Sequence, residues 1–493
     1  MSGDAIVLGI DVGTTNCKVL AFDLAGGLCA SASAPTPIER PRPGWVEHPP
    51  EALWQVIVGL IRQVVAQVAP SRVRGVAVAS MAEAGLLVGA DGRALHSIIS
   101  WNDSRSDVFY RAWLEHFGTE RFRAVVGNRP SPIFSVFKLQ WLRDFLPDAY
   151  ATAACWLHVS DYIAFRLCGV QATSPSLASR TMLLDLAHVE WSSTVVAAAE
   201  LRATLLPPLV PAGVPLGYIN ATAAAATGLP TDAVVGCGGH DHSCGALAAG
   251  VYDEGVALDS MGTAEPAFLA LHALPPTLPE TIVSSLGAHV VPGRFYTSKG
   301  IRNAGGSVEW AARALAMGSA AALMQAAAQA APGAGGVLFL PRLTPADRGG
   351  WVGLTADAGP PELARAVVEG LACEWRANLE LIERSVAQRA REVRAIGGGT
   401  RADVWVQIKA DVLGQPLYVL DLPESVALGA ALLGGLAAGV YNTIEAATAH
   451  LRLRRRVVTP DPERAMFYQQ HYHERYLRLP AALGGLGSFP VSM

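Results

Sequence analysis

Five residues near the start of the chain, Asp11-Val-Gly-Thr-Thr15, combine a carboxylate, a glycine and two hydroxyls. Glycine lets a backbone close on a phosphate, so that successive N–H groups and the hydroxyls of Thr14 and Thr15 can donate to its oxygens. Carboxylates beside phosphates commonly hold Mg²⁺, directly or through water, and Asp11 is placed to do so. The same pattern also forms ordinary hairpin turns, so the segment alone leaves both interpretations open.

A second carboxylate, Asp241, lies within Gly236-Cys-Gly-Gly-His-Asp-His-Ser-Cys-Gly245, which we expect to be a glycine-rich turn before the apolar run 246–251. A carboxylate at such a place caps a helix or works in catalysis. His240 and His242 flank it, which is typical of some metal sites. No third ligand stands at a suitable local spacing, so the pattern does not predict zinc.

Two further glycine turns lie in the second half of the chain. Ala395-Ile-Gly-Gly-Gly-Thr400 follows an expected strand and precedes an apolar segment, which suits close backbone approach by a base or a phosphate. Asp259-Ser-Met-Gly-Thr263 resembles the first turn and lies some 250 residues beyond it. Two similarly built halves with a boundary near residues 246–255 are the simplest interpretation; two unrelated glycine turns are the alternative.

The elements that must position these residues alternate between strand and helix, which predicts an α/β protein. Apolar runs and helical spacing place the elements as follows: strands at 5–10, 17–23, 29–34 and 74–80, a helix at 51–69, and strands at 255–258 and 267–271. The standard nucleotide and hydrolase signatures are absent: no glycine precedes any of the four lysines, and neither GxGxxG after a strand nor GxSxG occurs.

Composition excludes several classes of protein. The length of 493 residues is enough for two to four domains, and the 51% hydrophobic content is enough for large buried cores. The net charge of −4 does not suggest a nucleic-acid-binding surface. The start lacks the basic region of a secretory signal. The most apolar run, 427–441, is too short to cross a membrane and predicts a buried helix. Seven scattered cysteines predict reduced thiols in a cytoplasmic protein.

Taken in order, these segments resemble the FGGY carbohydrate kinases over nearly the whole chain. The matching stretches are Asp11 to Thr15, Gly44-Trp-Val-Glu-His48, Ile99-Ser-Trp-Asn-Asp-Ser-Arg105, Lys138-Leu-Gln-Trp-Leu142, Gly239-His-Asp-His242, Ser260-Met-Gly-Thr263, Ala304-Gly-Gly-Ser307, Gly397 to Gly399, Lys409-Ala-Asp-Val-Leu-Gly414 and Glu424 to Ala431. Each piece is weakly specific, but their colinearity is strong.

The resemblance implies two ribonuclease-H-like domains of the actin and hexokinase superfamily, at 1–249 and 250–493, with ATP and sugar in the cleft between them. It implies that Asp241 is the general base and that Asp11, with Asp241, is associated with Mg²⁺. The residues implied to bind nucleotide are Thr14, Thr15, Gly262, Thr263, Gly305, Gly398, Gly399 and Asp403, the last standing where the family often has Asn. Those on the sugar side are Glu83, Trp101, Asn102, Asp103, Asp241 and His242.

The expected reaction is transfer of the γ-phosphoryl group of ATP to a small sugar. Relatives that use glycerol carry Arg-Glu where this chain has Ala82-Glu83, which disfavours glycerol; Trp101-Asn102-Asp103 resembles xylulokinases, which favours a ketopentose or small polyol. The alternatives are a sensing protein without catalysis and an actin-like conformational ATPase. The expected partner is a small sugar or polyol, with no nucleic acid and no membrane, and a homodimer is compatible with the sequence.

Overall fold

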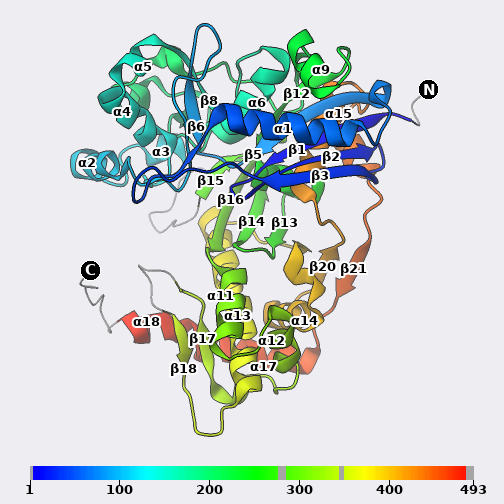
Figure 1. Ribbon diagram of the computed structural model, residues 1–493. Coiled ribbons are helices and arrows are strands. Elements are labelled where there is room, and N and C mark those ends of the chain that lie inside the picture. The colour runs from blue at the N-terminus through cyan, green and yellow to red at the C-terminus, as the bar shows by residue number, and fades with distance from the viewer. Residues whose placement is uncertain (1–3, 276–284, 344–348, 485–493) are drawn as a thin grey trace.

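Two mixed β-sheets organise the chain in the computed structural model, which describes residues 4–275, 285–343 and 349–484 (Figure 1). The first sheet has the strand order β11-β12-β5-β1-β2-β3. Its strands are β1 (Ile6–Val12), β2 (Asn16–Asp23), β3 (Leu28–Pro35), β5 (Val73–Ser80), β11 (Pro215–Tyr218) and β12 (Val234–His240). β1, β2 and β3 form an antiparallel meander, whereas β5 runs parallel to both β1 and β12.

The second sheet has the order β15-β16-β14-β13-β19-β20-β21. Its strands are β13 (Val256–Ser260), β14 (Glu265–Leu271), β15 (Ser285–Ala288), β16 (Phe295–Ile301), β19 (Glu392–Ile396), β20 (Leu417–Leu420) and β21 (Arg455–Val458). In both sheets an antiparallel hairpin, β1–β2 or β13–β14, has a parallel strand, β5 or β19, beside its first strand. The two halves therefore share a plan, as the repeated glycine turns predict.

Two helices, α10 (Asp241–Ala248) and α15 (Ser425–Ala437), lie between the sheets. Their side chains share one buried apolar cluster with residues of β1 and β5 from the first sheet and of β13, β14 and β19 from the second. The strands buried beneath this layer carry apolar residues on both faces, as is usual for strands covered on both sides. The apolar run that predicts a buried helix is thus α15, and it packs on the first sheet although it comes late in the chain.

Glycines allow α15 to approach the sheet closely. A Cβ atom at Gly9 of β1 would lie 1.7 Å from the carbonyl oxygen of Ala427, and one at Gly75 of β5 would lie 2.1 Å from that of Gly434. Any side chain at these positions would push the helix away from the sheet. The close packing of α15 on the sheet therefore depends on Gly9 and Gly75 lacking side chains.

The other helices cover the outer faces. Those on the first sheet are α1 (Pro50–Val65), α6 (Val159–Cys168) and α9 (Ala221–Thr227). Those packed with the second sheet are α11 (Ala304–Ala314), α12 (Ala320–Ala327), α13 (Pro360–Val386), α14 (Asp403–Leu413) and α17 (Pro462–Glu474). Shorter helices are α7 (Pro175–Ala178), α16 (Ile444–Ala449) and α18 (Leu479–Gly484). Figure 1 shows the first group above and the second below.

An additional lobe lies beside the first sheet. Its helices are α2 (Asp107–Phe117), α3 (Arg123–Val126), α4 (Ser135–Phe145), α5 (Pro147–Thr152) and α8 (Ser193–Ala198). Its small sheet has the order β4-β7-β6-β8, from β4 (Glu47–His48), β6 (Gly85–Gly89), β7 (Ile98–Ile99) and β8 (Ala153–His158). Two-stranded pairs are β9 (Leu184–Asp185) with β10 (Glu190–Trp191) and β17 (Leu338–Leu340) with β18 (Gly350–Val352).

The expected glycine turn at 236–240 is wrong: these residues form β12, which runs directly into α10. The glycines serve close packing instead, because a Cβ atom at Gly238 would lie 1.8 Å from the carbonyl oxygen of Val78 on β5. The strand register shifts between Gly236 and Gly239, as at a bulge.

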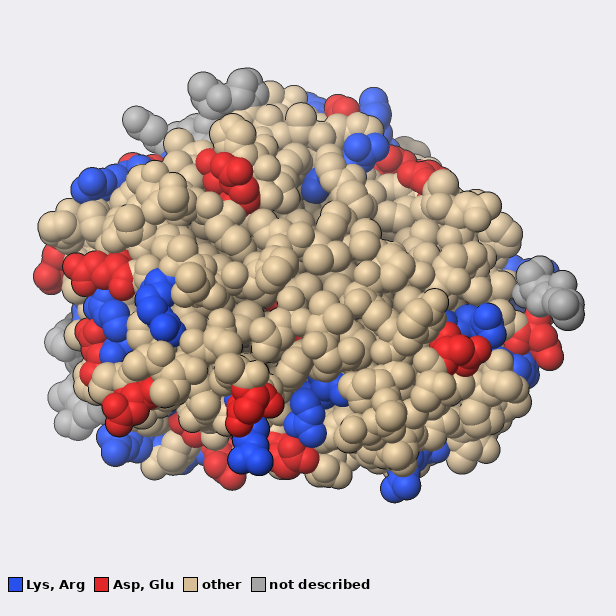
Figure 2. Space-filling view, turned by 90° about the horizontal axis from the view of Figure 1, so that it is seen from above, with Lys and Arg blue, Asp and Glu red and all other residues tan. Residues whose placement is uncertain are grey.

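Charge is mixed over the face seen from above the first domain. Figure 2 shows acidic and basic side chains interleaved around a broad uncharged centre. Among the described helices, none combines the length and the apolar character that crossing a membrane needs. All seven cysteines are free thiols.

Candidate active site

The carboxyl ends of β1 and β12 bring Asp11 and Asp241 to one edge of the first sheet. Asp11 on β1 and Gly239 on β12 both pair with Ala79 of β5, from opposite sides. Adjacent strands are about 4.8 Å apart, so the backbones of Asp11 and Gly239 are separated by roughly 10 Å and their neighbouring side chains can face one another. Two carboxylates from segments 230 residues apart thus meet at the end of the sheet where α/β proteins bind ligands.

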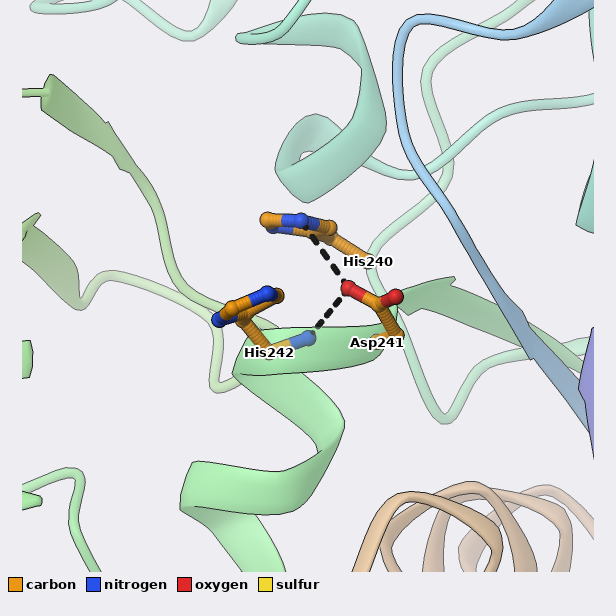
Figure 3. Close-up of side chains that lie close together, drawn as sticks. All are labelled: His240, Asp241 and His242. Atoms are coloured by element: carbon orange, nitrogen blue, oxygen red, sulfur yellow. Dashed lines mark hydrogen bonds and ion pairs between the residues drawn. The ribbon is translucent and has the colours of Figure 1, made fainter. Parts of the chain in front are cut away.

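Asp241 is the first residue of α10, and its carboxylate lies beside the imidazoles of His240 and His242 (Figure 3). Its Oδ1 atom accepts a 2.6 Å hydrogen bond from the backbone N–H of His242 and lies 3.1 Å from Nε2 of His240. The two imidazole rings stack with centroids 5.3 Å apart. Burial alone would raise the pKa of Asp241, but the charges of His242 and His240 and the hydrogen bonds from both residues lower it to about 2. The carboxyl group of Asp241 is therefore ionised at neutral pH.

Asp11 has the opposite character. Burial, followed by the negative charge of Asp241, raises its pKa to about 7, and the nearby cation of Lys18 opposes this only in part. Within the described residues its carboxylate accepts no hydrogen bond. A buried carboxylate whose pKa is raised by a neighbouring carboxylate marks a site that favours a cation, and carboxylate oxygens are the ligands that Mg²⁺ prefers. The pair Asp11 and Asp241 therefore fits Mg²⁺.

The ligand atoms of His240, Asp241 and His242 also lie within 4.8 Å of one another. The two histidines contact the aspartate directly, and His240 Nδ1 lies 3.5 Å from the hydroxyl of Tyr296. The His240 ring and the backbone N–H of His242 both contact the same carboxylate oxygen of Asp241. They give Asp241 a fixed direction at the start of α10.

The turn of the first hairpin presents its hydroxyls at the edge of the sheet. The N–H of Gly13 donates to the carbonyl of Asn16, and Thr36 Oγ1 donates to the carbonyl of Gly13. Thr14 Oγ1 accepts a 2.9 Å hydrogen bond from Trp101 Nε1, whereas Thr15 is exposed. The hydroxyl proton of Thr14 remains available to an acceptor because its best contact, Met81 Sδ, is 3.9 Å away.

Three glycine turns converge at the matching edge of the second sheet. Gly305 N–H donates to the carbonyls of Gly262 and Thr263, and Gly399 N–H donates to that of Met261. Gly397 has φ +97°, which glycine adopts readily, and a Cβ atom there would lie 2.7 Å from the carbonyl oxygen of Met261. These turns line a cavity of about 670 Å³, together with parts of α11, α12 and α14.

That cavity contains most of the nucleotide-binding residues expected from the sequence. Its lining includes Gly262, Thr263, Gly305, Gly398 and Gly399. Asp403 does not line it. That residue begins α14, is 85% exposed in its side chain and pairs with Arg456 at 2.7 Å.

Glu83 holds an unusual backbone conformation for a residue with a side chain, with φ +60°. Its buried carboxylate accepts a 2.7 Å hydrogen bond from Nε of Arg180, and Arg180 Nη2 lies 2.5 Å from the same oxygen. Ser135 Oγ donates to the Glu83 carbonyl. A positive φ outside glycine is costly and is found most often at functional sites. Glu83 is therefore fixed by two segments distant in sequence.

The other residues expected on the sugar side differ in exposure. Trp101 and Asn102 are exposed, whereas Asp103 is buried and its oxygens are occupied. Asp103 accepts hydrogen bonds from Arg105 and from the backbone N–H of Val46. Asp103 thus holds the 100–105 turn in place, while Trp101 reaches the turn between β1 and β2 by its hydrogen bond to Thr14.

Sequence reasoning missed two buried cations. Arg180 pairs with Glu83 across 97 residues, and no local pattern marks it. Lys409 on α14 lies between two carboxylates of the second hairpin: its Nζ is 2.5 Å from Asp259 Oδ2 and also contacts Glu265. A lone lysine in a segment otherwise rich in apolar residues was the only available signal. Asp259 therefore differs from Asp11, because it is fully buried and paired with Lys409.

Comparison with known proteins identifies the family. The chain matches the N-terminal domain of the FGGY family of carbohydrate kinases over residues 6–248 and the C-terminal domain of the same family over residues 260–438. It is 31% identical over 481 residues to the xylulose kinase of Escherichia coli K12, covering 96% of this chain and 98% of that protein. It is 29% identical over 462 residues to the L-fuculokinase of the same strain, covering 93% and 98%.

A solved structure agrees. The crystal structure of xylulose kinase from Rhodospirillum rubrum matches with a TM-score of 0.88 at 29% identity, covering 98% of this chain and 99% of that one. The match to the N-terminal domain model covers the first sheet, and the match to the C-terminal domain model covers most of the second sheet. This chain is a carbohydrate kinase of the FGGY family.

Proposed function

We propose that this kinase transfers the γ-phosphoryl group of ATP to a hydroxyl of a ketopentose, with Asp241 as the general base. The observation that carries the proposal is the proximity of Asp241 to Asp11 at the carboxyl ends of β12 and β1. The similarity to proteins named xylulose kinase, at 31% and 29% identity, supports a ketopentose. Glycerol is expected to be a poor substrate.

Residues of both domains would contact the nucleotide. The cavity beside Gly262, Thr263 and Gly398 would hold the nucleotide, and the backbone N–H groups of Thr263 and Gly398 would donate to its phosphates. Thr14 and Thr15 would contact the transferred phosphoryl group from the opposite side. In this arrangement the first domain comprises residues 1–249 and the second comprises residues 250–493.

Asp11 and Asp241 would hold Mg²⁺, which when bound neutralises charge on the phosphates. Asp241 is ionised and held in one direction by His240 and His242, so its carboxylate can accept the proton of the attacking hydroxyl. Phosphoryl transfer otherwise depends on positioning and charge stabilisation, which the two hairpins supply. Closure of the domains over the cleft would exclude the water that competes with the sugar.

The sugar would lie against the first domain, between Glu83 and Trp101. Glu83 offers carboxylate oxygens to hydroxyl donors, and Arg180 fixes its direction. The exposed ring of Trp101 can cover the apolar C–H face of the carbon chain. Its indole N–H links this side to Thr14 of the phosphate hairpin, so sugar and nucleotide sites share a hydrogen bond.

The test measures ADP formation with a panel of sugars. The panel contains D-xylulose, L-xylulose, D-ribulose, L-ribulose, L-fuculose, xylitol and glycerol, each with ATP and Mg²⁺. A ketopentose should give the highest kcat/KM. A polyol or a ketohexose as the best substrate would refute the substrate class, and no sugar-dependent ADP formation would refute the reaction.

The base is tested by Asp241→Asn with Asp232→Asn as the matched control. Asp232 lies just before the other end of β12, with a side chain 67% exposed. Loss of general-base catalysis costs about 10²- to 10⁴-fold in kcat, so Asp241→Asn should lose at least a hundredfold and the control should lose nothing. A loss below about tenfold would exclude Asp241 as the base.

A further inference from the structure

A second cavity, of about 380 Å³, lies behind the glycine turn of the nucleotide pocket. Its walls come from three segments: the turn at 397–401, the end of β20 with residues 421–423, and residues 454–456 at the start of β21. Gly398 and Arg401 line this cavity and also the larger one of about 670 Å³. One thin glycine turn therefore separates the two.

The cavity is lined by four arginines and a single carboxylate, Asp421. Two of the arginines are partly neutralised from outside: Arg456 by Asp403 at 2.7 Å, and Arg455 by Glu392 at 3.8 Å. Within the described residues, Arg401 and Arg454 form no ion pair. The lining thus carries an excess of positive charge that no side chain around it balances.

Guanidinium groups present several N–H donors in a planar fork that matches the oxygens of phosphate. A volume of about 380 Å³ lies within the range of small-molecule sites. Arg401 and Arg454, the two lining guanidiniums without an ion pair among the described residues, together offer enough N–H donors for the oxygens of one phosphate or diphosphate group. The chemistry of the cavity therefore fits a small anion that bears phosphate.

The same walls connect the two halves of the molecule. Residues 421–424 lead from β20 to α15, and residues 450–454 lead back from α16 to β21, so both segments cross between the second sheet and the helix layer on the first (Figure 1). The N–H of Asp421 donates to the carbonyl of Arg454, which joins the two crossing segments. An anion in this cavity would contact both crossings and the glycine turn at once.

We propose that this cavity binds a small phosphate-bearing anion and that its occupancy changes the affinity of the adjacent cavity for nucleotide. Binding follows from the arginine lining, and only the coupling depends on the proposed nucleotide site. A ligand that bridges the crossing segments stabilises one relative position of the two sheets over others. By linkage, the anion and the nucleotide then alter each other's affinity by the same factor.

The test titrates inorganic pyrophosphate into the full-length protein by calorimetry, with the nucleotide site saturated by a non-hydrolysable ATP analogue and ionic strength held constant with chloride. The variants are Arg454→Gln and Arg454→Glu. The matched controls are Arg452→Gln and Arg452→Glu, since Arg452 is exposed on the same segment but does not line the cavity.

We expect the wild type to bind pyrophosphate saturably. Arg454→Gln should weaken this binding at least fivefold and Arg454→Glu should weaken it more, whereas both controls should bind like the wild type. Absence of saturable binding, or equal binding by all variants, would overturn the proposed site. The KM for ATP should shift with pyrophosphate in the wild type and not in Arg454→Glu; binding without any shift would overturn the coupling. Without pyrophosphate, Arg454→Gln should phosphorylate its sugar like the wild type, so a failure of the kinase assignment would be visible separately.

Discussion

Replacing Lys409 by Met should destabilise the second domain strongly, because two buried carboxylates lose the one cation that pairs with them in the described part of the chain. Asp259, Glu265 and Lys409 have side chains with no exposed surface, and one oxygen of each carboxylate already lacks a hydrogen-bond partner. Removing one member of a buried charge pair costs about 3 to 5 kcal/mol, since an uncompensated charge remains. That is a large part of the roughly 5 to 15 kcal/mol that stabilises a typical domain.

Urea unfolding followed by tryptophan fluorescence measures this loss. Lys18→Met is the matched control, because Lys18 pairs with Glu424 at 2.8 Å but both side chains are about one-third exposed. Partly exposed pairs contribute about 0 to 1 kcal/mol, so the control should lose little. Adding Asp259→Asn and Glu265→Gln to Lys409→Met should recover most of the stability. A loss below about 1 kcal/mol for Lys409→Met would refute the assignment of Lys409 as the neutralising group.

Three further outcomes are expected. Burial raises the pKa of Glu265 from 4.5 in the unfolded chain to about 8, although Lys409 opposes the shift. Between pH 4.5 and 8 the folded state therefore keeps a proton on Glu265 that the unfolded state releases. The free energy of unfolding should therefore fall as pH rises from about 5 to 8, and urea melts of Glu265→Gln should show a smaller fall; an equal fall would contradict the assignment. Thr14→Val and Thr263→Val each remove a hydroxyl that would donate to a phosphate, at about 1.5 to 3 kcal/mol, so the KM for ATP should rise roughly 10- to 150-fold; steady-state kinetics with an unchanged KM in both would exclude a paired phosphate site. Glu83→Ala should lower kcat/KM for the best sugar at least a hundredfold while the KM for ATP changes less than twofold, and full activity would show that the sugar binds elsewhere.

Local patterns in the sequence predict the first hairpin and its neighbours within one or two residues. Alternating apolar runs place β1, β2, β3 and β5, because each strand is short, apolar and bounded by turn residues. The helix expected at 51–69 ends earlier, at Val65. Helix ends depend on capping and local contacts, which apolar spacing does not report.

Contacts between distant segments are what the sequence conceals. Asp11 and Asp241 are each visible as a carboxylate near glycine, but their meeting depends on strand order. Glu83 is visible at the end of β5, whereas its partner Arg180 belongs to a short helical turn without a distinctive pattern. The glycines at 236–239 are misleading for a related reason: close packing against β5 and turn formation both require glycine, and composition does not distinguish them.

The position of α15 shows the same limit. Its apolar character predicts burial, but a helix that is apolar on every face does not show which face packs against which partner. The sequence therefore does not show which sheet the helix covers. The structure places it on β1, β5 and β12, all of which precede it by at least 185 residues.

That placement has a consequence for biosynthesis. The strands of the first sheet leave the ribosome long before α15, and at about 5 to 20 residues per second roughly 10 to 40 s separate β12 from the helix. During that interval one face of the sheet, including the bare backbone at Gly9 and Gly75, lacks its cover. The nascent first half must therefore wait, compact or bound by a chaperone, until the last quarter of the chain arrives to complete it.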